Sequence, residues 1–271
     1  MISIIIRTYN EEKNIGRCLD AVFNQKTNKS FEVIIVDSGS TDKTLEIAKK
    51  FNVRIIKITD FTFGKSLNKG IEYAKGKYCV LLSADVTPMN DEWLENLIKP
   101  LKSKNIAGVF GKEVPYDNCN CCEARRVIGT FERIPDGMFT SSNAVIKKGT
   151  WLKNKYDEKT TSSEDWFWAK KVKEKGYKIE YASDAIVLHS HNINFSKLFN
   201  RIKNQTYNIA RLEKINPITL FLKGIMNFIY CMFFDLKFIR FNPLKIPFIL
   251  IYELIVLLSF MSAAISLGLR K

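Results

Sequence analysis

The chain has 271 residues, 46% hydrophobic and 26% charged, with 13 glycines and 7 prolines, a composition that excludes a mostly disordered, collagen-like or disulfide-stapled protein. The 42 Lys and Arg outnumber the 28 Asp and Glu, and the net charge of +14 indicates an anionic partner: nucleic acid, a phosphorylated ligand or an acidic membrane face. Residues 196–271 hold eleven basic and three acidic residues, a net +8 beside the longest apolar run, which favours a membrane surface over nucleic acid.

In the first hundred residues, short apolar runs rich in β-branched residues alternate with helical patterns. Strands are predicted over 2–6, 33–36, 53–58 and 78–82, and helices over 10–23, 41–51, 65–74 and 90–101. The strands are continuously apolar, which is typical of strands covered on both faces by helices. The pattern therefore predicts an α/β fold with a mostly parallel sheet flanked by helices.

Polar clusters follow three of these strands, at residues 8–11, 37–40 and 83–85. Right-handed crossovers bring the carboxyl ends of parallel strands to one edge of the sheet. Ligands bind at that edge in open α/β sheets, so these clusters predict a binding site.

The second half is less regular. We expect strands at 107–111, 142–146, 179–181 and 185–188, and a helix at 164–175, which extend the sheet and form an acceptor side. The cluster Cys119, Cys121 and Cys122 can ligate a metal, form disulfides or lie in a reduced loop. The reduced loop is favoured, because no second correctly spaced cysteine pair is present.

A set of motifs in a fixed order resembles one known family. The motifs are Arg7-Thr8-Tyr9-Asn10-Glu11, Val36-Asp37-Ser38-Gly39-Ser40-Thr41-Asp42, Ser83-Ala84-Asp85, Ser163-Glu164-Asp165 and His189-Ser190-His191. From Ile4 to about His191 the chain resembles the inverting family-2 glycosyltransferases, and is most similar to their rhamnosyltransferase-like members. The resemblance implies the GT-A nucleotide-sugar-binding fold.

The resemblance implies a donor site at the strand ends. Asp37 would contact the nucleoside, with Thr8, Tyr9 and Glu11 around the base, and Ser40, Lys65 and Ala84 complete the expected donor contacts. Each also has a structural interpretation. Asp37 can cap the next helix, although Asp42 with Ser40 is the better cap. Glu11 can stabilise the positive N-terminal end of a helix dipole. Lys65 can be a solvated lysine at a helix start.

A divalent cation, Mg²⁺ or Mn²⁺, is the implied cofactor. In the family an Asp-x-Asp-like element holds the metal on the donor diphosphate, and here it is reduced to Asp85, with Ser83 in the first position. His189 is the expected further ligand, ahead of His191. The alternative for both histidines is a satisfied surface or core side chain.

The general base of an inverting transfer is expected in the pair Glu164-Asp165. Asp165 is the favoured base, with Glu164 supporting it, because a carboxylate must take the proton of the acceptor hydroxyl. Two acids in a first helical turn can instead complement the helix dipole. Trp166 would line the acceptor site, although both it and Trp168 can be core residues.

The C-terminal part is expected to associate with a membrane. Residues 246–269 are apolar over a length just sufficient to cross a bilayer, with Glu253 as the only charge. Residues 218–241 have the pattern of an interfacial amphipathic helix or of a second shallow insertion. The sequence is compatible with three arrangements of this segment: a membrane span, a re-entrant hairpin, and a soluble hairpin packed on the catalytic domain. Lys237, Arg240 and Lys245 place the catalytic domain on the cytoplasmic side, whereas Arg270-Lys271 argue the other way.

We therefore predict a catalytic domain at 1–195, a basic connecting helix at 196–217 and a membrane-associated helical hairpin at 218–271. The expected enzyme is an inverting hexosyltransferase of cell-surface glycan synthesis. It would take a nucleotide-sugar donor and a saccharide or lipid-linked acceptor, and no nucleic acid. The alternatives are a polyprenyl-phosphate glycosyltransferase, and a non-catalytic basic protein that binds membrane or nucleic acid.

Overall fold

The computed structural model describes residues 1–132, 134, 138–191, 194–239 and 242–269. Within them the chain forms two compact units. The first comprises Met1–Val114 and Phe131–His189, and the second comprises Pro115–Thr130 and Ser190–Lys271. Each unit is considered separately below. Arg240 and the pair Arg270-Lys271, used above to argue membrane sidedness, lie outside the described residues.

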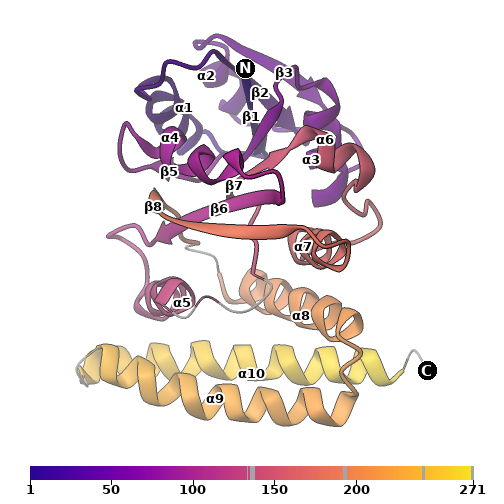
Figure 1. The fold of residues 1–271 in the computed structure, drawn as a ribbon. Coiled ribbons are helices and arrows are strands. Elements are labelled where there is room, and N and C mark those ends of the chain that lie inside the picture. Colours follow the sequence, from indigo (N-terminus) through magenta and orange to yellow (C-terminus); the bar gives the residue numbers. More distant parts are fainter. Residues whose placement is uncertain (133, 135–137, 192–193, 240–241, 270–271) are drawn as a thin grey trace. The chain divides into compact units, whose positions relative to one another are not determined.

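The first unit is built on an eight-stranded mixed sheet with the order β3-β2-β1-β4-β7-β6-β8-β5 (Figure 1). The strands are β1 (Ile2–Thr8), β2 (Phe31–Asp37), β3 (Val53–Lys57), β4 (Tyr78–Ser83), β5 (Thr87–Pro88), β6 (Ile106–Val114), β7 (Asn143–Lys147) and β8 (Lys178–Leu188). β1 to β4 are parallel to one another, as predicted, and β6 is parallel to β8. β7 is antiparallel to both β4 and β6, and β5 is antiparallel to β8.

Helices cover the sheet on both faces. They are α1 (Ile15–Phe23), α2 (Thr44–Ala48), α3 (Phe63–Tyr73), α4 (Trp93–Ile98), α6 (Lys148–Lys153) and α7 (Glu164–Glu174), with a 3₁₀ turn, η1, at Lys99–Lys102. Ile4 and Ile6 of β1 share one core cluster with Leu19 of α1 and Leu94 of α4. α3 packs on β1 and β2. This two-sided burial explains why the central strands β1, β2 and β4 are mostly apolar.

Two helices begin later than the sequence pattern predicts. Helix α1 starts at Ile15 rather than at residue 10, and α2 starts at Thr44 rather than at residue 41. The residues before each helix form polar loops instead, and Asn10 adopts a left-handed backbone conformation with φ 54°. The sequence pattern therefore predicted a helix for residues that instead hold these two loops together.

The second unit consists of α5 (Cys121–Glu132), α8 (Phe195–Leu212), α9 (Pro217–Phe238) and α10 (Ile246–Gly268), with a 3₁₀ turn, η2, at Pro243–Lys245. Helix α5 contradicts the loop expected around the cysteine cluster. Its Cys122 is buried, and all six cysteines are free. By length and composition, the described residues include two helices that could cross a membrane, at Pro217–Phe238 and Pro243–Gly268.

The two compact units divide the chain differently from the predicted domains. The predicted catalytic domain ran unbroken to residue 195, whereas residues 115–130 group with the C-terminal helices and the first unit ends at His189. The basic connecting helix expected at 196–217 corresponds to α8. That helix packs along α10, so it is part of the second unit.

Candidate functional site

A largely but not fully buried arginine joins the strand ends at which the site was predicted. Arg7 lies near the end of β1, and its Nη2 donates hydrogen bonds to Ser83 Oγ at 3.3 Å and to Ser141 Oγ at 3.2 Å. Its Nη1 forms an ion pair of 3.2 Å with Glu164 Oε1. Ser83 ends β4, Ser141 precedes β7, and Glu164 begins α7. One guanidinium thereby fixes four elements at the carboxyl edge of the parallel strands.

The neighbouring acids Glu164 and Asp165 have different partners. Glu164 is buried and accepts hydrogen bonds from Arg7 and from Ser141 Oγ at 3.0 Å. Asp165 accepts hydrogen bonds from two backbone amides, Ser141 N at 3.2 Å and Trp166 N at 2.8 Å. Glu164 is therefore neutralised by an arginine, and Asp165 is held by two uncharged donors.

The pKa of Asp165 is raised to about 7. Burial is the largest cause, and repulsion from the Glu164 carboxylate adds to it, while the amide hydrogen bonds and Arg7 act in the opposite direction. A carboxylate that titrates near neutral pH is suited to accept a proton during catalysis.

The two tryptophans of α7 differ in position. Trp168 is 1% exposed, donates its indole N–H to the Asn154 carbonyl at 2.7 Å and stacks on Tyr156. Trp168 is thus a core residue. Trp166 is half-buried in the turn that carries Asp165, which keeps it available as the predicted acceptor contact.

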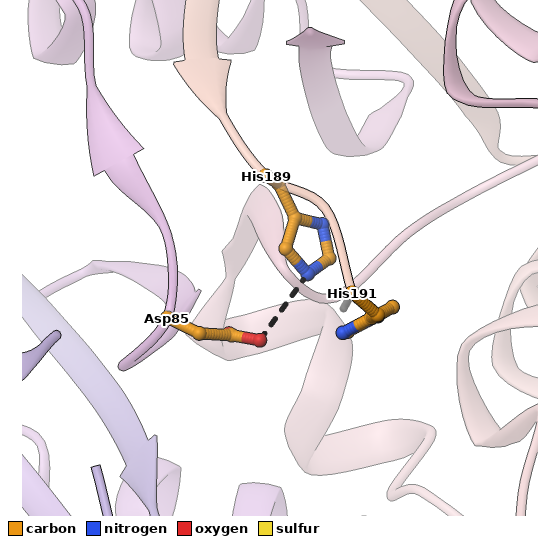
Figure 2. Close-up of side chains that lie close together, drawn as sticks. All are labelled: Asp85, His189 and His191. Atoms are coloured by element: carbon orange, nitrogen blue, oxygen red, sulfur yellow. Dashed lines mark ion pairs between the residues drawn. The ribbon is translucent and has the colours of Figure 1, made fainter. Parts of the chain in front are cut away.

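Asp85 and His189 face each other, as the resemblance implies for metal ligands. His189 Nε2 lies 3.6 Å from Asp85 Oδ2 (Figure 2). Asp85 follows β4 and His189 follows β8, far apart in sequence. Strand β5 pairs with β8 through Thr87 and Leu188, which brings the loop containing Asp85 to the end of β8. Figure 2 also draws His191, which follows His189 by two residues.

Glu113 is a site residue that the sequence analysis missed. It lies on β6, and its Oε2 is 2.6 Å from His189 Nδ1. Its Oε1 accepts hydrogen bonds from the hydroxyls of Ser142 at 2.5 Å and Thr140 at 3.1 Å. The available signal was a carboxylate near the end of a strand whose first six residues are apolar or glycine.

This arrangement fits a divalent cation. A ligating histidine usually donates its second ring nitrogen to a carboxylate, and Glu113 occupies that position for His189. The Nε2 atom is thereby directed toward Asp85. One carboxylate and one imidazole would leave several positions of a six-coordinate Mg²⁺ or Mn²⁺ for diphosphate oxygens and water. In the metal-free protein, burial opposes the charged imidazolium, but Glu113 and Asp85 outweigh it and raise the pKa of His189 well above its ordinary value.

The loop after β2 is organised by Asp37. Its carboxylate is fully buried and accepts hydrogen bonds from the backbone N–H groups of Gly39 at 3.1 Å and Ser40 at 3.2 Å. Asp42, rather than Asp37, accepts from Thr44 N at the start of α2. Asp37 also pairs in register with Thr8 of β1. In this conformation Asp37 shapes the turn beside the predicted donor pocket.

The loops after β1 and β2 are tied together by side chains. Asn10 N donates to Ser40 Oγ at 2.9 Å, and Thr41 N donates to Asn10 Oδ1 at 2.8 Å. Glu11 N donates to Thr44 Oγ1 at 2.7 Å. Tyr9 projects from this frame and is 59% exposed. A rigid loop that presents an exposed aromatic ring can stack a nucleobase.

The remaining predicted donor contacts vary in exposure. Lys65 lies in the first turn of α3, is 38% exposed and forms an ion pair of 2.6 Å with Asp60. This environment agrees with the alternative to a donor contact, in which Lys65 is a solvated lysine at the start of a helix. Ala84 is buried, and its N–H donates to the Arg7 carbonyl at 3.0 Å. Burial raises the pKa of Glu11, and the Asp85 carboxylate contributes to the increase.

Comparison with known proteins gives the family context of this geometry. The sequence model of the family described as "Glycosyl transferase family 2" matches residues 3–192. The O-antigen chain rhamnosyltransferase WbaN of Salmonella anatum is 28% identical over 221 residues, which cover 73% of this chain and 69% of that protein. Glycosyltransferase AglE of Haloferax volcanii is 30% identical over 208 residues, which cover 69% of this chain and 66% of AglE.

Solved structures share the fold at low sequence identity. The mannosyltransferase PcManGT from Pyrobaculum calidifontis, in complex with GDP-Man and Mn²⁺, has a TM-score of 0.64 at 17% identity, over 99% of this chain and 74% of that chain. S. aureus TarS 1–349 in complex with UDP-GlcNAc has a TM-score of 0.58 at 16% identity, over 100% of this chain and 92% of that chain. These neighbours are GT-A glycosyltransferases, so the predicted fold class is confirmed.

Proposed function

Because the chain belongs to glycosyl transferase family 2, we propose that it transfers a sugar with inversion from a nucleotide-diphosphate donor to a hydroxyl of a saccharide or lipid-linked acceptor. The observation that carries this proposal is the contrast between Asp165 and Glu164. One acid of the pair has a pKa of about 7 and is held by amides, and the other is paired with Arg7.

Asp165 is the proposed general base. In a single displacement, the acceptor oxygen bonds to the anomeric carbon, its proton passes to an Asp165 oxygen, and the nucleoside diphosphate leaves with the electron pair of the broken C–O bond. Attack from the face opposite the leaving group inverts the anomeric centre. Glu164 positions the helix start and raises the pKa of its neighbour. Trp166 is the proposed contact for the acceptor.

Asp85 and His189 are the proposed ligands of a divalent cation, which would offset the charge that grows on the leaving diphosphate. The proposal is supported by the 3.6 Å approach of the two side chains and by Glu113 behind His189. A solved neighbour was determined with Mn²⁺, which agrees with this ion class. Titration of the protein with each ion measures whether the site prefers Mg²⁺ or Mn²⁺.

The nucleoside is proposed to lie on the frame formed by the loops after β1 and β2. Tyr9 would stack on or wall the base, with Thr8, Glu11 and Ser40 around it and Asp37 maintaining the turn. Lys65 and Ala84 complete the proposed donor side. Solved neighbours were determined with GDP-Man and with UDP-GlcNAc, which agrees with a nucleotide-sugar donor.

A role in cell-surface glycan synthesis is supported by relatives that are named as O-antigen chain rhamnosyltransferases. Membrane association is supported by the two long apolar helices. We place the catalytic unit on the cytoplasmic side, where nucleotide sugars are made.

The test compares the wild type with Asp165→Asn. Asp91→Asn serves as a matched control, because the Asp91 side chain is 42% exposed and forms an ion pair with Lys26. We expect sugar transfer to be lost in Asp165→Asn, donor binding to be nearly unchanged, and the control to be fully active. A polyprenyl phosphate is already an anion and needs no base, so full activity of Asp165→Asn would favour that alternative acceptor.

A further inference from the structure

One side of the α9–α10 hairpin is covered by other helices of the second unit. α9 and α10 run antiparallel, since Leu220 near the start of α9 packs with Ala263 near the end of α10. Their packing is close, because a Cβ on Gly224 would lie 2.7 Å from Phe260 Cβ. Figure 1 shows α5 and α8 on the same side of this pair, and among the described residues no other helix of the second unit covers the other side.

Helix α8 follows α10 along most of its length. Leu198, at one end of α8, shares a core cluster with Ile249, and Ala210, near the other end, shares one with Ala264. Residues 249 and 264 are about 22 Å apart along a helix. The exposed side of α8 is polar and carries Lys197, Asn204, Gln205 and Arg211. Any environment that surrounds α10 over this length must therefore also accommodate a charged helix.

The acids of the two apolar helices are directed toward α5. Glu253 of α10 is fully buried and accepts two hydrogen bonds of 2.9 Å from Arg126. Asp235 of α9 is 1% exposed and is paired with Arg125. Removing one partner would leave a buried, uncompensated charge. Through these ion pairs, one side of the hairpin packs against α5. Both carboxylates therefore lie on that side and not on the opposite side.

The uncovered side is an apolar stripe on both helices. We define the hairpin stripe as the exposed residues Ile218, Leu222, Met226, Ile229 and Phe233 of α9 with Ile251, Leu254, Leu258 and Ile265 of α10. The α9 members are spaced by three or four residues, which keeps them on one face of the helix from end to end. Such a face over two whole helices is far larger than the isolated exposed apolar residues of a soluble surface.

The charges beside the hairpin stripe have one sign. Among the described residues of 217–268, the exposed charged side chains are all lysines, namely Lys223, Lys237 and Lys245. Exposed lysines that flank an apolar face are complementary to an anionic lipid headgroup layer.

We propose that the α9–α10 hairpin lies in the plane of one leaflet of an anionic membrane, with the hairpin stripe among the acyl chains and α8 toward water, and does not cross the bilayer. A spanning α10 would draw the polar side of α8 into hydrocarbon, whereas an in-plane hairpin leaves it hydrated. This inference rests on the membrane association proposed above, and it is independent of the proposed sugar transfer.

The first test is flotation of the full chain with vesicles of phosphatidylcholine and phosphatidylglycerol. Met226→Glu and Phe233→Glu place a charge in the hairpin stripe, and Gln205→Glu places one on the polar side of α8. All three positions are exposed, so the fold should persist. We expect each stripe variant to bind vesicles at least roughly tenfold more weakly, and the control to bind as the wild type does. Failure of the wild type to bind vesicles, or stripe variants that lose only self-association, would overturn the proposal.

The second test separates an in-plane hairpin from a spanning one. Leu244, in the turn between the helices, is 89% exposed and is changed to Cys in a background with Cys119 and Cys121 replaced by Ser. Glu213→Cys, in the turn before α9, is the control. We expect a membrane-impermeant maleimide to label both positions in inside-out vesicles and neither in intact spheroplasts. Labelling of Leu244→Cys in spheroplasts would show a crossing and overturn the inference, while donor binding would still report on the proposed function.

Discussion

The pH dependence of sugar transfer should report the ionisation of Asp165. With a pKa of about 7, roughly 9% of the side chain is ionised at pH 6 and roughly 91% at pH 8. Only the ionised carboxylate can accept the acceptor proton, so kcat/KM should rise about tenfold between these pH values. The assay is the initial rate of nucleoside diphosphate release at saturating metal. A rate that is flat between pH 6 and pH 8 would refute the assignment.

Substitutions at the same pair of acids sharpen this test. Asp165→Asn should lower kcat by about 10²–10⁴ and remove the rise with pH. Its amide NH₂ would face one of the two backbone donors that now bind Asp165, so thermal unfolding must be measured alongside. Glu164→Gln removes the negative charge that raises the pKa of Asp165, and should move the midpoint to lower pH. A midpoint that moves upward would contradict this electrostatic account.

Three further substitutions test other parts of the site. Glu113→Gln should weaken Mn²⁺ binding by about 10–100-fold in calorimetry, because His189 loses its carboxylate partner, whereas the exposed Glu180→Gln should leave it unchanged. Arg7→Met should cost about 3–5 kcal/mol of unfolding free energy in denaturant titrations, because it leaves Glu164 buried without its ion pair, and a loss below ~1 kcal/mol would contradict that role. Gly64 lies beside Lys65 in the first turn of α3. Gly64→Ala should destabilise the protein by about 1–3 kcal/mol, because the added Cβ would clash with the backbone oxygen of Asp157. An unchanged melting temperature would show that the contact relaxes.

The sequence predicted the first half of the sheet well because burial and periodicity agree there. β1, β2 and β4 are largely apolar and buried, and that pattern appears directly in the residues, whereas the edge strand β3 carries the exposed Arg54 and Lys57. Strand direction is not encoded in the same way. β7 is buried to the same degree as β4, yet it runs antiparallel to β4.

The loops and helix α5 show where local patterns are insufficient. Residues 10–14 are polar and were predicted as the first turn of a helix whose apolar face begins at Ile15, but Asn10 adopts a left-handed conformation and binds residues 40 and 41. The cysteine-rich stretch was expected to be a reduced loop, because it lacks a second correctly spaced cysteine pair. In the structure Cys121 and Cys122 begin α5, and Arg125 and Arg126 of this helix pair with acids more than 100 residues later.

The sequence likewise predicted some residues of the candidate site and missed others. The resemblance placed Asp85 and His189 together, and the structure brings them within 3.6 Å, although their role as metal ligands stays a proposal. Glu113 was missed, because its partner His189 is 76 residues away. The different environments of Glu164 and Asp165 depend on Arg7, which is 157 residues from Glu164. Partners this distant in sequence become neighbours only when the sheet is assembled.

The most direct test of the central claim is turnover of a panel of sugar nucleotides by the full chain in vesicles with Mn²⁺, measured as nucleoside diphosphate release. We predict release from at least one donor, its loss on chelation and its recovery when the metal is restored. We also predict that Asp165→Asn binds that same donor with near wild-type affinity but does not turn it over. Absence of binding and release across the panel, or equal turnover by Asp165→Asn, would contradict the account.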